Sequence, residues 1–301
     1  MAGALAAVAG ILDELRSLLH ERVLDYIPFF FFYCALCELA GRVVPYLFPA
    51  VYDFCGAKAA RDGAPLPTDA AGLAAARARL AVSMRTAVVA STMALHVSLG
   101  SLYGLLSPAT AGALRHSLQA ESPLTRHLCS VAVGYFLWDL LYCWDGLVFI
   151  VHGVACLAVF AGSLRPFLHH MAMVTLLFEA STPLLHLRRI MIDSDAADSV
   201  WYPLVNGAFS ATFFAARIAH GLYACGLWWV EVEAALATGG LAPDRLPMVR
   251  MYQVLCLLLS GLNVYWFVAK IVPGHLRQRS PRAAKQPVGK ASRAAKAGKA
   301  A

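Results

Sequence analysis

Long apolar stretches separated by short polar ones dominate this chain. Seven apolar windows lie at residues 27–44, 86–106, 127–144, 146–162, 166–187, 202–230 and 250–272. A helix needs roughly 20 residues to cross about 30 Å of hydrocarbon, so each window is a candidate membrane span. The pattern therefore predicts an all-α fold, a polytopic transmembrane bundle of about seven helices.

The composition agrees with this prediction. Hydrophobic residues make up 59% of the chain and charged residues 14%, which excludes the soluble globular class. The eight cysteines lie almost entirely inside the apolar windows, where cysteine behaves as a small hydrophobic residue. The Cys34-x-x-Cys37 spacing has no second pair, so we predict neither a metal site nor a cofactor.

Three regions differ in character along the chain. Residues 1–79 are expected to hold an amphipathic surface segment, the first transmembrane helix, and a cytoplasmic loop that ends in a second surface helix. Residues 80–272 carry the other six windows. Residues 273–301 are basic, lack acids and are rich in alanine, which predicts a disordered cytoplasmic tail. The tail either sets the topology and solubility of the chain or contacts anionic cytoplasmic lipid, and nucleic acid is the least favoured partner.

The distribution of basic residues predicts an orientation. If seven spans end in a cytoplasmic tail, sixteen lysines and arginines lie on the cytoplasmic side and seven on the opposite side. Basic residues are enriched in cytoplasmic loops. This bias favours a luminal or external N-terminus and a cytoplasmic C-terminus.

Ionisable residues interrupt three consecutive windows, at Asp139, His152 and Glu179. Such residues are costly in a membrane and usually face a bundle interior or a watery cavity. Counted from the short turn at 144–146, Asp139 and His152 lie at the same depth, and Glu179 lies within about 4.5 Å of that depth. The three side chains are therefore expected to meet around a central cavity.

Two hypotheses fit this cluster. In the catalytic one, a carboxylate of Glu179 or Asp139 orients the imidazole of His152, which acts as a general base in acyl transfer. In the structural one, the same groups form interhelical hydrogen bonds worth about 0.6 kcal/mol each. The spacing of these residues leaves both open.

Four further polar residues are candidates for substrate binding. Arg217 stays charged in the sixth window, so it needs Glu179, Asp139 or a phosphate of lipid or acyl-CoA as its partner. Ser181 precedes Pro183, where a kink in the helix is expected. The remaining two candidates are Asn206 and His96, polar residues within apolar windows.

Several of these residues belong to an ordered set of motifs that covers about residues 80–272. The set consists of Gly134-Tyr135-x-x-x-Asp139, His152 in the next helix, Phe178-Glu179-Ala180-Ser181-Thr182-Pro183 followed by Arg188, and Phe213-Phe214-x-x-Arg217-Ile218. This set resembles the TLC-domain family, in particular the TLC domain-containing protein 4-like branch related to ceramide synthases. The resemblance implies a helical bundle around a lipid-accessible cavity in the endoplasmic reticulum or a related membrane.

The resemblance also bears on activity. Ceramide synthases carry a His-His pair, then His-Asp and a second Asp, whereas this chain has His152-Gly153, Phe178-Glu179 and Thr182. The incomplete motif favours a protein that binds membrane lipid in its cavity and contributes to lipid homeostasis. The alternatives are an acyl-CoA-dependent acyltransferase with His152 as general base, and a seven-helix receptor, which only the helix count and the orientation support.

Overall fold

The computed structural model describes residues 2–48, 70–115, 118–143, 146–194, 196–241 and 245–274, and the predicted loop and tail lie largely outside these ranges. All regular structure within them is helical, which confirms the predicted all-α bundle. The chain forms two compact units, residues 1–263 and 264–301. The described part of the second unit continues as helix, including a π-helical stretch, η5 (Phe267–Ile271).

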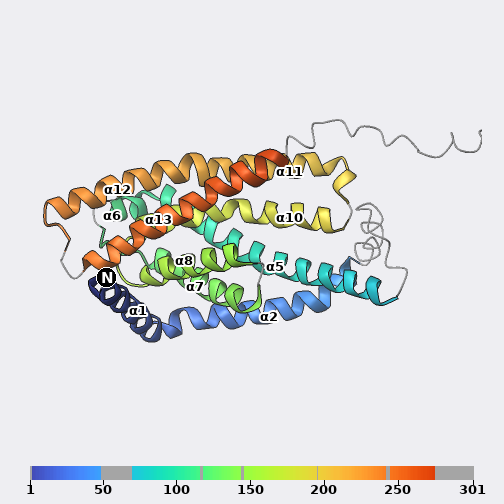
Figure 1. The fold of residues 1–301 in the computed structure, drawn as a ribbon, viewed down its shortest axis with the longest axis horizontal. Helices are drawn as coiled ribbons and strands as arrows, with labels where there is room; N and C mark the ends of the chain where they lie inside the picture. The colour runs from blue at the N-terminus through green and yellow to red at the C-terminus, as the bar shows by residue number, and fades with distance from the viewer. Residues whose placement is uncertain are drawn as a thin grey trace, which may run out of the picture. The chain divides into compact units, whose positions relative to one another are not determined.

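Each of the seven predicted windows lies on helical elements, and further helices cover residues 2–21 and 108–115 (Figure 1). Three windows are divided into shorter elements, and two of these, the fifth and the sixth, contain the irregular turns of a polar site described below. In chain order the elements are α1 (Ala2–Glu21), α2 (Val23–Leu47), α5 (Ala70–Leu106), α6 (Pro108–Arg115), α7 (Pro123–Tyr142), α8 (Leu147–Gly162), α9 (His169–Leu176), η1 (Leu177–Ser181), α10 (Thr182–Asp193), η2 (Ala196–Asp198), α11 (Trp201–Phe213), η3 (Phe214–His220), α12 (Gly221–Ala237) and α13 (Leu246–Trp266).

Three stretches of the described chain are long and apolar enough to cross a membrane: Val23–Leu47, Leu80–Leu106 and Leu246–Gly274. Helix α8 is apolar but shorter. Helix α5 has 37 residues, about 55 Å at 1.5 Å per residue, and exceeds a hydrocarbon core of about 30 Å. The surface helix expected before the second span is therefore the first part of one continuous helix.

The apolar core lies between α2, α5, α7 and α8, and Figure 1 shows α2 running beside α5. Tyr33 and Trp138 are each only 1% exposed within it, and the rings of Tyr33 and Tyr135 meet edge to face at 5.7 Å. Gly134 brings α7 against the backbone of α2: a Cβ there would lie 2.8 Å from the amide nitrogen of Phe30 and 2.9 Å from the carbonyl oxygen of Tyr26.

Salt bridges connect the ends of the helices outside the apolar core. Arg165, after α8, donates to the Glu21 carboxylate of α1 at 2.7 Å, and this hydrogen bond lowers the pKa of Glu21. Arg250 of α13 donates to Glu233 of α12, which lowers the pKa of Glu233. These contacts fix α1 and α12 to the segments that carry the site.

We predict that Gly134→Ala destabilises the fold. The added methyl group would collide with the backbone of α2, which cannot move aside as a flexible side chain could, and overpacking of this kind costs about 1–3 kcal/mol. A lower melting temperature in detergent, measured by a thermal-shift assay, is the expected result. Gly207→Ala is the matched control, because nothing lies within 4 Å of a Cβ at that position. Equal melting temperatures for the two variants would contradict the close approach of α7 to α2.

Candidate functional site

The site includes the point where the helix of the fifth window, residues 166–187, is interrupted, and Pro183 causes this interruption. Proline has no N–H and its ring clashes with the carbonyl four residues earlier, here that of Glu179. The chain responds with the 3₁₀ turn η1, in which the Thr182 N–H bonds to the Glu179 carbonyl. The carbonyl of Phe178 is thereby released from the usual helical pattern and accepts from the Arg217 Nε at 2.9 Å.

Arg217 reaches this turn from the π-helix η3, which interrupts the sixth window. Single π-helical turns within α-helices are frequent at functional sites. Gly221, at the start of α12, makes room for the contact, since a Cβ there would lie 2.8 Å from the ring of Phe178. The two broken windows therefore meet where each departs from α-helical geometry.

A salt bridge is the centre of this contact. Arg217 Nη2 lies 3.2 Å from Glu179 Oε1, and the Glu179 Oε2 accepts from the Thr182 hydroxyl at 2.7 Å. The Arg217 and Glu179 side chains are only 8% and 12% exposed. Arg217 also donates to Asn263 Oδ1 of α13 at 3.4 Å and to Ser181 Oγ at 3.2 Å. One guanidinium thus joins η3, η1 and α13.

A cavity that is partly open to the surroundings lies beside this salt bridge, and the empty space of the cavity together with its open mouth is about 750 Å³. Its walls come from α8, α9, η1, η3, α12 and α13, and the residue before α9, Leu168, adopts the left-handed backbone conformation (φ 56°). The lining residues are His152, Cys156, Val159, Phe160, Ser163, Leu168, Met171, Ala172, Thr175, Phe178, Glu179, Arg217, Cys225, Trp228, Tyr252, Cys256, Leu259, Ser260 and Asn263.

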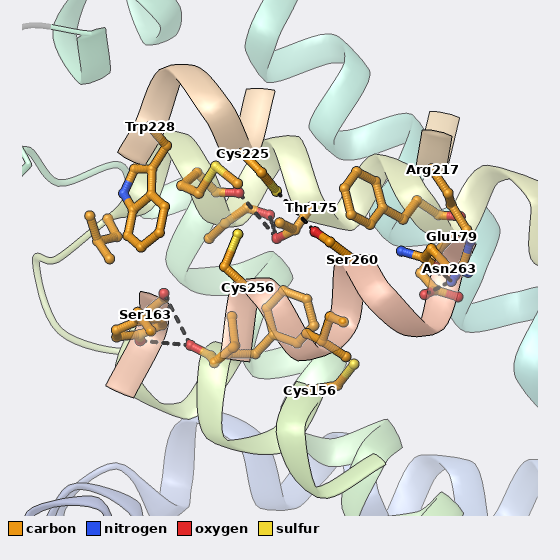
Figure 2. Close-up of a pocket in the computed structure, with 18 of the residues that line it drawn as sticks. Cys156, Ser163, Thr175, Glu179, Arg217, Cys225, Trp228, Cys256, Ser260 and Asn263 are labelled. Carbon is orange, nitrogen blue, oxygen red and sulfur yellow. Dashed lines mark hydrogen bonds and ion pairs between the residues drawn. The ribbon is translucent and has the colours of Figure 1, made fainter. Parts of the chain in front are cut away.

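The two ends of the cavity differ in polarity. Glu179, Arg217 and Asn263 lie together at one end, whereas Trp228 lies at the other (Figure 2). Arg217 and Trp228 are eleven positions apart along η3 and α12, about 16 Å by helical rise. The cavity is therefore a long apolar space with one charged end.

The structure brings three of the predicted site residues to this cavity, His152, Glu179 and Arg217. Ser181 is not among the lining residues; it is 1% exposed and its hydroxyl accepts a hydrogen bond from Arg217. Asp139 lies at the contact of α7 with α8, where its Oδ2 would be 3.7 Å from a Cβ on Gly153. Asp139 is thus near the predicted cluster without lining the cavity.

Two predicted substrate-binding residues lie elsewhere. The Asn206 side chain accepts from Arg188 Nε at 2.6 Å and joins α11 to α10. His96 faces His127 of α7, with their Nε2 atoms 3.1 Å apart, on an exposed surface of α5. These two residues were predicted only from their position within apolar windows, and that position does not fix the direction in which a side chain points.

The surroundings of His152 bear on the catalytic hypothesis. Its ring lies edge to face with Phe136, at 6.3 Å between centroids, and its Nε2 is 3.7 Å from Cys156 Sγ. The hydrogen bonds that position the Glu179 carboxylate come from Arg217 and Thr182. Arg217 and Thr182 are therefore two partners that hold the Glu179 carboxylate in place.

Sequence reasoning missed several lining residues. Asn263, which was not among the predicted site residues, forms an interhelical hydrogen bond, and its partner is Arg217 at the charged end. Cys156, Cys225 and Cys256 were assigned to packing, and all three line the cavity. Polar groups near the middle of the last window, Ser260 and Asn263, were the available signal. Within the described residues no group of three or more His, Cys, Asp or Glu side chains could hold a metal ion.

Comparison with known proteins identifies the family. The model of the TLC domain, which groups TRAM, LAG1 and CLN8 proteins, matches residues 78–272. This chain belongs to the TLC domain family. The family comprises membrane proteins linked to lipid metabolism, and the apolar helices fit a membrane protein.

Relatives in two yeasts support this assignment. An uncharacterized TLC domain-containing protein of Saccharomyces cerevisiae is 32% identical over 49% of this chain and 48% of its own length. Topoisomerase I damage affected protein 4 of the same yeast is 31% identical over 46% of this chain and 51% of its own. An uncharacterized TLC domain-containing protein of Schizosaccharomyces pombe is 28% identical over 50% of this chain and 51% of its own length.

The chain thus spans about half the length of the curated relatives it matches. No solved structure matches it significantly. Family membership therefore rests on the domain model and on these partial matches.

We predict that Glu179→Ala strongly destabilises the protein. The substitution leaves the Arg217 guanidinium buried without its carboxylate, and breaking a buried ion pair in this way costs about 3–5 kcal/mol. The measurement is the melting temperature of the purified protein in detergent.

Glu231→Ala is the matched control, since Glu231 lies on the exposed face of α12 and its loss should change the melting temperature little. A melting temperature of Glu179→Ala equal to that of Glu231→Ala would show that the salt bridge does not support the fold.

Proposed function

We propose that this TLC domain protein binds a membrane lipid in the cavity between α8, α9, α12 and α13, and that it contributes in this way to membrane lipid homeostasis. The observation that carries the proposal is the polarity of the cavity. A long apolar wall ends at Glu179, Arg217 and Asn263 (Figure 2), which matches a lipid with one polar end.

The composition of the cavity wall supports a ligand of this kind. Small-molecule sites are mostly apolar with a few placed polar groups, and the lining residues follow this pattern. Trp228 lies eleven positions beyond Arg217 along η3 and α12, so the apolar wall extends along α12 away from the charged end.

The location forms part of the proposal. We place the protein in the endoplasmic reticulum as a multi-pass membrane protein, with its N-terminus luminal and its C-terminus cytoplasmic. The lipid-metabolic roles of the family and the excess of basic residues on the expected cytoplasmic side support this assignment. The same roles favour a lipid ligand over the receptor hypothesis.

An acyl-CoA-dependent acyltransferase is the second candidate function. His152 lines the same cavity as Glu179 and Arg217, so an imidazole is available beside a polar end where a substrate hydroxyl or amine could bind. In this alternative His152 is the general base, and acyl-CoA joins membrane lipid as a ligand.

We predict that Ser260→Trp reduces the lipid bound to the purified protein. Ser260 lies on α13 between the two ends of the cavity, so an indole there would occupy the space that a chain needs (Figure 2). The expected result is loss of most of the co-purifying lipid, measured by native mass spectrometry with lipidomics.

Leu257→Trp is the control, because Leu257 lies on the same helix and is 62% exposed. Equal lipid in both variants would argue against a cavity-bound ligand. Incubation with acyl-CoA in the same experiment separates the two candidate functions: a bound lipid that stays chemically unchanged supports binding, whereas a new acylated lipid that disappears in His152→Ala establishes an acyltransferase.

The proposed orientation makes a further prediction. A glycosylation acceptor sequence inserted before α2 is expected to be modified in cells, because that segment would face the lumen. An acceptor inserted after residue 274 is expected to stay unmodified. The measurement is an enzyme-sensitive shift in gel mobility, and the reverse pattern would refute the orientation.

A further inference from the structure

The charges of the cavity limit what can bind in it. Among its lining residues in the described part of the chain, Glu179 and Arg217 are the charged ones, and they form a salt bridge. The ring of His152 lies edge to face with Phe136. The salt bridge contributes one positive and one negative charge, which balance each other.

The hydrogen bonds of Arg217 further restrict which charged ligands can bind in the cavity. Its Nη2 donates to Glu179 and Thr182, its Nε to the Phe178 carbonyl and Ser181, and its Nη1 to Asn263. A ligand carboxylate or phosphate at this end would compete with Glu179 for the guanidinium. It would also leave a second negative charge in a space of low polarity, which is costly without a further cation.

Uncharged polar groups face no such penalty. Asn263 carries an amide, and Ser260 and Thr175 carry hydroxyls, all of them along the cavity wall (Figure 2). A hydroxyl or carbonyl of a ligand could bond to such groups without disturbing the charge balance. Neutral hydrogen bonds of this kind orient a ligand, while the apolar wall supplies the binding energy.

We propose that the cavity selects lipids whose cavity-bound end is uncharged and carries a hydroxyl or carbonyl group, and that the Glu179–Arg217 salt bridge excludes anionic ends such as a free fatty acid. This inference rests on the proposed function, because it names the class of lipid for the same cavity.

The test compares two probes of equal chain length, a fatty alcohol and a fatty acid, each with the same photoreactive group on the chain. The pH is kept alkaline so that the fatty acid is ionised. We expect the alcohol to label the wild-type protein with an affinity at least about tenfold higher than that of the acid. Peptide mapping is expected to place the label on α12 and α13.

Charge-altered variants test the cause of the preference. Glu179→Gln leaves the positive charge of Arg217 unbalanced, so the preference is expected to shift toward the fatty acid. Glu179→Gln combined with Arg217→Gln restores a net charge of zero and should restore the preference for the alcohol. Glu231→Gln, which changes an exposed residue, should behave as the wild type does.

The outcomes separate the two proposals. If neither probe labels the cavity of the wild-type protein, the proposed lipid-binding function fails, and this inference fails with it. If both probes label the cavity with equal affinity, or the acid is preferred, lipid binding stands and selection by charge is refuted. The wild-type comparison decides this even if the charge-altered variants do not fold.

Discussion

The salt bridge between Arg217 and Glu179 is the interaction on which the polar part of this structure depends. A guanidinium cannot give up its charge, and a buried charge requires a partner of opposite sign with hydrogen bonds to its remaining groups. Glu179, the Phe178 carbonyl and Asn263 meet that requirement from two other segments of the chain. The polar end of the cavity therefore has a fixed geometry before any ligand binds.

Local irregularities of the backbone make this salt bridge possible. Pro183 forces the 3₁₀ turn that frees a carbonyl, and the π-helix η3 presents Arg217 to it. Gly221 permits the close packing of Phe178. Regular helices would have satisfied their own backbone groups and left Arg217 with fewer acceptors. The irregular turns thus position the Arg217 side chain and the groups that accept its hydrogen bonds.

The charged end and the apolar wall together account for the functional proposal. Membership of the TLC domain family indicates a membrane protein linked to lipid metabolism, and the cavity offers a space that suits a lipid. Under our proposal its paired charges distinguish between lipid classes, which family membership alone does not. Turnover of that lipid would require His152 to act on it, whereas binding requires only the wall and the polar end.

The sequence by itself determined the all-α membrane fold, the family and the presence of costly polar residues such as Glu179 and Arg217. The length of the apolar windows and the charged residues within them can both be recognised without a structure. The sequence also identified Pro183 as a helix break. Only the tertiary structure decided which groups meet. Asp139, Asn206 and His96 had the right depth or setting and yet lie outside the cavity lining, while Asn263 and Cys256 line it. The reason is rotational: composition and spacing set how deep a residue lies in the membrane, but packing against neighbouring helices sets the direction in which it points.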